Sequence, residues 1–395
     1  MDPSDLRIAL FSGNYNYVRD GANQALNRLV GFLLRQGAEV RIYSPVRANP
    51  AFEATGTLVN VPSVPIPRRP EYRIPSSLSR EVRADLESFA PNIIHVSSPD
   101  VVAHRALSWA RDRGIPVVAS VHTMFETYLQ YYGLSFFEPT FRAILRRFYR
   151  RCDAIVAPAQ STVAVLHAQR MSRDISIWSR GVDREQFNPA RRSLEWRRAQ
   201  GIADDEMLVA FLGRIVMEKG LDVFVEAIAG AVRRGVRLRV LVIGEGPARD
   251  WFAANLPADS VFVGQQTGTN LAVALASADI FLNPSITEAF GNVTQEAMAC
   301  GLPVIAAWAT GTTSLVEDGV TGTLVDPVEP DQYGAAIALY AADPALRARH
   351  GAAGLEFAST RDWDVINGAV MQLYTRVIER RERLDALYGK RWLPS

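Results

Sequence analysis

The sequence predicts an α/β protein made of two domains of similar size, each built on a parallel sheet. Short apolar runs typical of buried strands alternate with longer segments of helical apolar periodicity. This alternation indicates a parallel sheet covered by helices on both faces. The alternating pattern stops near residue 183 and starts again, and a chain of 395 residues is long enough for two such domains.

The N-terminal half contains five expected strands, each a run of apolar residues. They cover residues 6–11, 40–43, 93–96, 116–121 and 154–157. In a sheet of this kind ligands bind beyond the carboxyl ends of the strands. Gly13, Asp20 and Gly21 follow the first strand, and His122 closes the strand at 116–121. A histidine at such a strand end serves a structural role about as often as a functional one, so both interpretations stay open.

An arginine-rich segment at 141–151 follows a group of aromatic residues between 128 and 137. Its apolar side chains fall on one helical stripe, and its arginines fill the other side at positions 142, 146, 147, 150 and 151. A basic amphipathic helix beside aromatic residues can lie on an anionic bilayer. An ordinary surface helix with a solvated arginine face explains the pattern equally well.

The C-terminal half repeats the alternation of strands and helices. Its strands are expected at 207–212, 238–243, 260–263, 279–282 and 304–307. We therefore divide the chain into an N-terminal domain of residues 1–183 and a C-terminal domain of residues 184–360. A long helical pattern follows at 361–395. Both domains are expected to be Rossmann-like, with a cleft between them.

The helix start after the strand at 279–282 has the features of an anion site. A polar loop precedes a helix that should begin near Asn292. The backbone N–H groups of Gly291, Asn292 and Val293 then have no partner within the helix. Such a helix start favours an anionic group, for example a diphosphate.

Two carboxylates flank this helix start, Glu288 in the loop and Glu296 in the helix. A carboxylate can accept hydrogen bonds from two sugar hydroxyls at once. A phosphate cradle between two hydroxyl acceptors is the pattern of a nucleotide-sugar site. The alternative is an ordinary loop carboxylate and an ordinary helix acid.

The loop after the strand at 207–212 adds two cations, Arg214 and Lys219. For a diphosphate, Arg214 offers the paired N–H donors of a planar guanidinium, and Lys219 offers a compact positive charge. Lys219 is one of two lysines in a chain with 41 arginines. The neighbouring Gly244-Glu-Gly246 is only part of a dinucleotide fingerprint, because Arg249 replaces its third glycine. This departure argues against NAD.

Composition excludes several other classes. The net charge is +1, and the basic residues are local, so nucleic-acid binding fits poorly. No apolar run approaches the roughly 20 residues of a membrane span. Cys152 and Cys300 stand alone, without the clustered cysteines and histidines of a zinc site. We expect neither a metal nor a cofactor.

Together these motifs resemble the retaining glycosyltransferases of family GT4, which have the GT-B fold of two Rossmann-like domains facing a cleft. The resemblance rests on Gly213-Arg214 with Lys219-Gly220, on residues 284–304, and on the run Arg180-Gly-Val-Asp183. Within the family the chain is similar to the branch that glycosylates lipids, including mannosyl- and sulfoquinovosyl-lipid synthases. His122, Thr123, Phe125, Tyr128 and Trp178 carry that similarity.

The resemblance implies roles for the candidate residues. Arg214 and Lys219 would bind the diphosphate, and Glu296 the ribose. Glu288 and the backbone from Phe290 to Val293 would hold the donor sugar, which His122 would contact from the other domain. The remaining nucleotide or acceptor contacts would come from Gly13, Asp20, Gly21 and Gly264. One departure is the loop after the first strand, where Gly13-Asn14 replaces the Gly-Gly pair of many relatives. The C-terminal helix would return to the first domain.

We therefore expect a metal-independent retaining transferase that moves a hexosyl or hexuronosyl unit from a UDP- or GDP-sugar to a membrane lipid or glycolipid. It would work in the cytoplasm, at the inner face of the plasma membrane. The alternatives are a sugar-nucleotide epimerase, a transferase acting on a soluble glycan, and a non-catalytic binding module. The sugar, the acceptor and the oligomeric state are left open.

Overall fold

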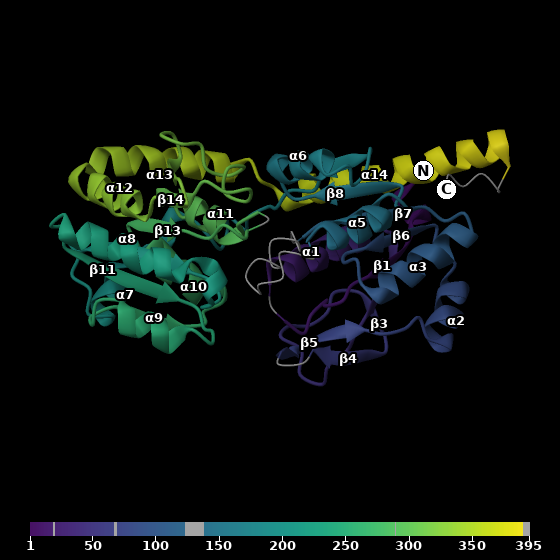
Figure 1. Cartoon of the computed structure of the whole chain (residues 1–395), viewed down its shortest axis with the longest axis horizontal. Coiled ribbons are helices and arrows are strands. Elements are labelled where there is room, and N and C mark those ends of the chain that lie inside the picture. The colour runs from purple at the N-terminus through teal and green to yellow at the C-terminus, as the bar shows by residue number, and fades with distance from the viewer. Residues whose placement is uncertain (19, 67–68, 123–137, 289, 390–395) are drawn as a thin grey trace. The chain divides into compact units, whose positions relative to one another are not determined.

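The protein is described here by a computed structural model that covers residues 1–18, 20–66, 69–122, 138–288 and 290–389. It divides into two compact units (Figure 1). Unit 1 comprises Met1–Arg180 together with Trp363–Ser395, and unit 2 comprises Gly181–Asp362. The chain therefore leaves unit 1 after Arg180 and re-enters it at Trp363.

Unit 1 is built on a parallel sheet with the strand order β3-β2-β1-β6-β7-β8-β9. Its strands are β1 (Arg7–Phe11), β2 (Glu39–Ser44), β3 (Thr57–Asn60), β6 (Ile93–Val96), β7 (Val117–Ser120), β8 (Ala154–Ala157) and β9 (Ile175–Ile177). Five of these strands fall where the sequence predicts them. The sequence analysis missed the two edge strands, β3 and β9, and the antiparallel pair β4 (Ser63–Ile66) and β5 (Arg69–Pro75).

Helices cover both faces of this sheet. They are α1 (Gly21–Arg35), α2 (Arg80–Phe89), α3 (Val101–Asp112), α5 (Glu138–Tyr149), α6 (Gln160–Ala168) and α14 (Trp363–Tyr388). Successive side chains of a strand point to opposite faces. Ile8 and Leu10 accordingly join a core with α1 and α14, whereas Ala9 and Phe11 join a core with the other four helices.

Unit 2 contains a second parallel sheet, with the order β12-β11-β10-β13-β14-β15 (Figure 1). Its strands are β10 (Met207–Leu212), β11 (Leu238–Ile243), β12 (Val261–Gly264), β13 (Ile280–Asn283), β14 (Val304–Ala307) and β15 (Gly322–Val325). Only the edge strand β15 is absent from the sequence-based expectation. Its helices are α7 (Leu194–Ala199), α8 (Leu221–Arg233), α9 (Arg249–Asn255), α10 (Gly268–Ala276), α11 (Asn292–Ala299), α12 (Pro330–Ala342) and α13 (Pro344–Ser359).

Each sheet has one point where the strand order reverses. In unit 1 the chain builds β1, β2 and β3 outward and then returns to place β6 on the other side of β1. In unit 2 it builds β10, β11 and β12 and then returns to place β13 beside β10. The loops after two such strands diverge and leave room for a ligand. The topology therefore points to the β1/β6 and β10/β13 loops.

The arginine-rich helix differs from its prediction. Helix α5 ends at Tyr149, so Arg150 and Arg151 lie beyond it. Arg146 and Arg151 donate hydrogen bonds to Gln169 O and Ser108 Oγ at 2.9 and 2.8 Å, which ties them to neighbouring segments. Part of the basic pattern thus has a structural role. The aromatic residues between 128 and 137 lie outside the described residues.

Candidate active site

The predicted site residues Lys219 and Glu288 meet at the switch point of unit 2. The loop after β10 carries Lys219, the loop after β13 carries Glu288, and the ammonium forms an ion pair with Glu288 Oε1. Both side chains are largely but not fully buried. Thr287 Oγ1 also donates to Glu218 O at 3.1 Å. The two loops are therefore joined by an ion pair and a hydrogen bond.

A close backbone contact completes the junction. Gly220 has a φ of +71°, and a Cβ atom there would lie 3.0 Å from Pro284 O. Glycine is the one residue that combines this conformation with such an approach at little cost. The tight contact brings the start of α8 against the loop that leads into α11.

Helix α11 begins at Asn292, as the sequence predicts. Gly291 occupies the N-cap with a φ of +92° and offers no side-chain cap. No hydrogen-bond acceptor within the described part of the chain serves the backbone N–H groups of Asn292 and Val293. Uncapped N–H groups at a helix start attract an anion. The preceding Phe290 side chain is buried, so only its backbone can contribute.

The strand before α11 holds the helix start in place. Asn283 ends β13, is buried, and donates from Nδ2 to Thr294 Oγ1 at 2.9 Å. Its Oδ1 accepts from the backbone N–H of Ser285 at 3.2 Å. One amide side chain thus fixes both the loop and the first turn of the helix. Glu296 lies one turn further along α11 and is partly buried.

Gly244 and Gly246, the two glycines of the incomplete dinucleotide fingerprint, allow two loops of unit 2 to pack closely. A Cβ atom at Gly244 would lie 1.9 Å from Gly213 O, and one at Gly246 would lie 2.2 Å from Ile215 O. The loop after β11 therefore crosses directly over the loop that carries Arg214. Gly264 O accepts from Gly244 N at 2.9 Å, so the end of β12 supports the same crossing. Arg214 itself is exposed.

Sequence reasoning overlooked the loop after β14. Gly311 lies there, and a Cβ atom at that position would come within 2.4 Å of Glu288 O. Gly311 thus lets this loop pack against the backbone of the Glu288 loop. A Gly-Thr-Thr run that begins four positions after the end of a predicted strand, at the same sheet edge as Glu288, was the available signal.

In unit 1, Gly13 lies at the β1/β6 switch point. A Cβ atom there would lie 3.1 Å from Asp100 Oδ2 and 3.4 Å from Ser98 Oγ, both on the loop after β6. Asp20 is the N-cap of α1, where its Oδ1 accepts from Asn23 N at 2.8 Å, and Gly21 is the first helical residue. Burial raises the pKa of the Asp20 carboxyl.

His122 lies at the end of β7 and uses both ring nitrogens. Nε2 is 2.8 Å from Ser120 Oγ, and Nδ1 is 3.0 Å from an Arg180 nitrogen. The ring packs edge-on against Trp178. Burial, and then the charge of Arg180, lower the pKa of His122 well below its usual value. Thr123, Phe125 and Tyr128, which support the family resemblance, lie outside the described residues.

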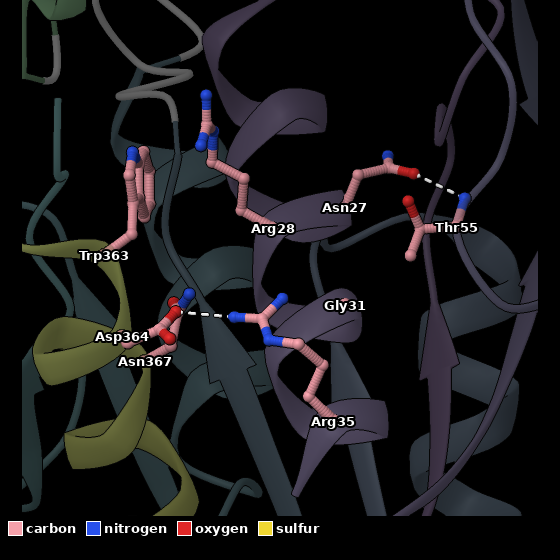
Figure 2. A pocket seen from close by; sticks show the side chains of 8 residues that line it. All are labelled: Asn27, Arg28, Gly31, Arg35, Thr55, Trp363, Asp364 and Asn367. Atoms are coloured by element: carbon pink, nitrogen blue, oxygen red, sulfur yellow. Dashed lines mark hydrogen bonds and ion pairs between the residues drawn. The ribbon is translucent and has the colours of Figure 1, made fainter. Parts of the chain in front are cut away.

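A cavity of about 340 Å³ lies between α1 and α14, away from every predicted site residue. Arg28 and Arg35 of α1 point toward Trp363 and Asp364 of α14, as Figure 2 shows. Arg35 donates to Asp364 Oδ1 at 2.6 Å. Asp364 is therefore held by an ion pair within unit 1.

Three further observations concern the described residues only. They contain no cluster of three or more histidine, cysteine or acidic residues that could hold a metal ion. None of their helices is both long enough and apolar enough to cross a membrane. Both cysteines are buried and unpaired.

Two parallel α/β sheets of this kind form the architecture of the GT-B glycosyltransferases. Residues 19–186 match the family described as Glycosyltransferase Family 4, and residues 193–357 match Glycosyl transferases group 1. The chain belongs to glycosyltransferase family 4, whose members use nucleotide-sugar donors.

Similar proteins support this assignment along the whole chain. A GDP-mannose-dependent alpha-mannosyltransferase of Mycolicibacterium smegmatis is 32% identical over 95% of this chain and 99% of its own length. A GDP-mannose-dependent alpha-mannosyltransferase of Corynebacterium glutamicum is 28% identical over 97% of this chain and 92% of its own. The sulfoquinovosyl transferase SQD2 of Arabidopsis thaliana is 31% identical over 100% of this chain and 79% of its own.

Solved structures share the fold. Sucrose-phosphate synthase from Thermosynechococcus elongatus has a TM-score of 0.79 at 21% identity, covering 95% of this chain and 100% of its own. The Anabaena protein HepE in complex with UDP and glucose has a TM-score of 0.74 at 19% identity, covering 94% of this chain and 100% of its own.

Proposed function

We propose that unit 2 binds a nucleotide-diphosphate sugar at the switch point between β10 and β13. The observation that carries this proposal is the Lys219–Glu288 ion pair beside the uncapped start of α11. A diphosphate would lie against the N–H groups of Gly291, Asn292 and Val293 and be neutralised by Lys219 and Arg214.

The remaining candidate residues then take roles consistent with their positions. Glu288 would accept hydroxyl hydrogen bonds from the donor sugar, with the backbone of Phe290 beside it. Glu296, one turn further along α11, would accept from the ribose hydroxyls. Gly264 would keep the end of β12 clear for the nucleotide. In unit 1, Gly13 and the start of α1 would serve the acceptor or the phosphate.

Catalysis would consist mainly of charge stabilisation. As the glycosidic bond to the diphosphate breaks, negative charge grows on the leaving phosphate. Fixed cations and helix-start N–H groups stabilise such charge because they need no reorientation during the reaction. We propose that the acceptor hydroxyl attacks from the face that the phosphate leaves and gives its proton to that phosphate. The anomeric configuration is then retained.

We propose a membrane lipid or glycolipid as the acceptor, at the cytoplasmic face of the membrane. The exposed face of α5 supports this, because Ile144 is 52% exposed and Arg147 is exposed beside it, with Arg150 just beyond the helix. An apolar residue among arginines suits an anionic lipid surface. The names of the relatives above suggest GDP-mannose as the donor, or a sulfoquinovosyl unit as the transferred sugar.

Product analysis tests this function. The protein is incubated with GDP-mannose or a UDP-sugar, with and without a lipid extract, and the products are examined by mass spectrometry and NMR. We expect a new glycolipid with the anomeric configuration of the donor. An epimerised donor in the absence of acceptor would support the epimerase instead. An inverted glycoside would contradict the proposed mechanism.

A further inference from the structure

A continuous chain of hydrogen bonds crosses the core of unit 1. Tyr374 Oη on α14 lies 2.5 Å from His95 Nδ1, and His95 Nε2 lies 2.8 Å from Ser120 Oγ. The same hydroxyl lies 2.8 Å from His122 Nε2, and His122 Nδ1 lies 3.0 Å from an Arg180 guanidinium nitrogen. We call these five residues the histidine chain.

Four of the five residues of the histidine chain are buried, and the chain is attached to α14 at two points. His95, Ser120, Arg180 and Tyr374 are all buried. Trp178 packs edge-on against both imidazoles, with ring centroids 6.0 and 5.4 Å away. Its Nε1 donates to Oδ1 of Asn367, a second residue of α14, at 3.1 Å. Tyr374 and Asn367 are therefore the two attachments.

Arg180 fixes the protonation of His122. A guanidinium can only donate, so Nδ1 of His122 must accept its hydrogen bond. A ring with an unprotonated Nδ1 cannot be the imidazolium, in which both nitrogens carry protons. Nε2 of His122 therefore carries the single ring proton and donates to Ser120 Oγ. Both nitrogens are then occupied within the protein.

Beyond Ser120 two arrangements satisfy the distances. In the first, the Ser120 hydroxyl donates to His95 Nε2, and His95 Nδ1 donates to Tyr374 Oη. In the second, the Tyr374 hydroxyl donates to His95 Nδ1, and His95 Nε2 donates to Ser120 Oγ. Each arrangement leaves one hydroxyl hydrogen without an acceptor in the chain. His122 has the same tautomer in both, so its protonation does not depend on which arrangement is populated.

We propose that His95, Ser120 and Tyr374 are positioning residues for His122. Through the histidine chain they hold in place the His122 ring, which Arg180 keeps neutral and protonated at Nε2, so that it serves the transfer reaction as a fixed group and not as a general acid or base. The tautomer follows from the geometry alone, whereas the contribution to transfer rests on the proposed function.

The charged and titratable groups that face His122 support a neutral ring across the physiological range. Within the described residues they are Arg180, from the segment after β9, and His95 of β6, with Tyr374 of α14 behind His95. Burial lowers the pKa of His95 to about 3. An imidazolium at His122 would face the positive charge of Arg180, because the two nitrogens are 3.0 Å apart.

NMR of the full-length protein labelled with ¹⁵N-histidine tests the tautomer without any substrate, with His122→Asn used to assign the signals. We expect a protonated Nε2, an unprotonated Nδ1 and no titration between pH 5.5 and 8. An Nδ1-protonated ring, or a midpoint near the ordinary histidine pKa of about 6.5, would overturn the proposal.

Two tyrosine variants test the positioning role. Tyr374→Phe removes one end of the histidine chain, and Tyr340→Phe is the matched control, because Tyr340 is a buried tyrosine bonded to His350 Nδ1 at 2.7 Å in unit 2. We expect Tyr374→Phe to shift the ¹⁵N signals of His122 and to lower kcat/KM about tenfold, the effect of losing roughly one buried hydrogen bond. Tyr340→Phe should change neither.

Ser120→Ala gives the same test if Tyr374→Phe does not fold, since it removes the acceptor of the His122 proton. A fall in kcat/KM with unchanged His122 signals would overturn the positioning role, and so would shifted signals with unchanged kcat/KM. A wild-type protein that transfers no sugar at all would refute the proposed function and leave the tautomer measurement standing.

Discussion

At the scale of single residues, the proposed donor site depends most on Lys219 and Glu288. We predict that Lys219→Ala and Glu288→Gln each lower turnover by about a hundredfold or more, because each removes a fixed group aimed at the donor. Steady-state transfer assays with circular dichroism as the folding check measure this. Both variants should remain folded, since each change leaves the rest of the loop junction intact.

Glu206→Gln is the control for a lost ion pair. Glu206 pairs with Arg239 at 3.1 Å in the same unit, and both side chains are about as buried as Glu288. Turnover of this variant should stay within about twofold of the wild type, as expected for a site remote from the donor. Equal losses in Glu206→Gln and Glu288→Gln would assign the effect to stability and contradict the proposed role.

Residue identities alone predicted part of this site. The sequence placed Lys219 and Glu288 on separate loops, and the prediction that α11 begins at Asn292 is confirmed. Gly311 was overlooked, because its importance is a backbone contact with a residue 23 positions earlier, and the Gly-Thr-Thr run was its one local signal. The sequence also could not show that His122 contacts Arg180, 58 positions along the chain, or that Ser120 joins it to His95 and Tyr374.

At the scale of elements, the close crossing of two loops makes Gly246 indispensable. A Cβ atom there would overlap Ile215 O at 2.2 Å, so Gly246→Ala must displace the backbone next to Arg214. We predict a loss of about 1–3 kcal/mol in the free energy of unfolding, together with weaker donor binding. Urea titration and isothermal titration calorimetry measure the two effects.

Gly368→Ala provides the matched control on α14. A Cβ atom at Gly368 would lie 3.8 Å from Phe32 Cζ, an ordinary van der Waals distance. Alanine favours a helix over glycine by about 1 kcal/mol, so this variant should be at least as stable as the wild type. If Gly246→Ala behaved like Gly368→Ala, the two loops would not be in the contact described.

His95, in strand β6, should make the free energy of unfolding depend on pH. The pKa of His95 is lowered to about 3 by burial, against 6.5 for an exposed ring. Between these values the unfolded state binds one more proton than the folded state, so the free energy of unfolding falls as the pH falls. The contribution of His95 should be about 2 kcal/mol smaller at pH 5 than at pH 7.

Urea titrations of the wild type and His95→Gln at both pH values measure this contribution. The variant should show the weaker pH dependence, by that amount. An identical pH dependence in the two proteins would show that His95 is not buried in its neutral form.

The different burial of central and edge strands also explains why some strands were not predicted from the sequence. The central strands of each sheet are covered by helices on both faces and appear as continuous apolar runs. Edge strands are half exposed, as β3 (Thr57–Asn60) illustrates, and their mixed composition resembles that of loops. The edge strand β12 was still predicted from its Val-Phe-Val run, whereas β3, β9 and β15 are recognised only through their pairing, which the local sequence does not contain.

At the scale of the whole molecule, we predict that the protein binds to an anionic membrane. Arg147→Glu should weaken sedimentation with vesicles containing anionic lipid severalfold, because about 1 kcal/mol is lost for each basic residue near the surface and an added acid is repelled. Arg237→Glu, at another exposed arginine, is the control. Equal binding by both variants, or binding that ignores lipid charge, would contradict a role for α5.

Domain organisation was predicted from the restart of the strand–helix alternation, which is a long-range feature of the chain. The sequence divides the chain at 183/184 and 360/361, and the compact units divide at 180/181 and 362/363. In the structure α14 packs against α1 within unit 1. The family resemblance suggested this return, which no local pattern could specify.

The most direct test of the central claim is a crystal structure with a bound GDP- or UDP-sugar. We predict the diphosphate within hydrogen-bond distance of the N–H groups of Asn292 and Val293 and of Lys219 Nζ, with the sugar hydroxyls on Glu288. A diphosphate bound elsewhere, without contact to Lys219, and a sugar without contact to Glu288 would contradict this prediction.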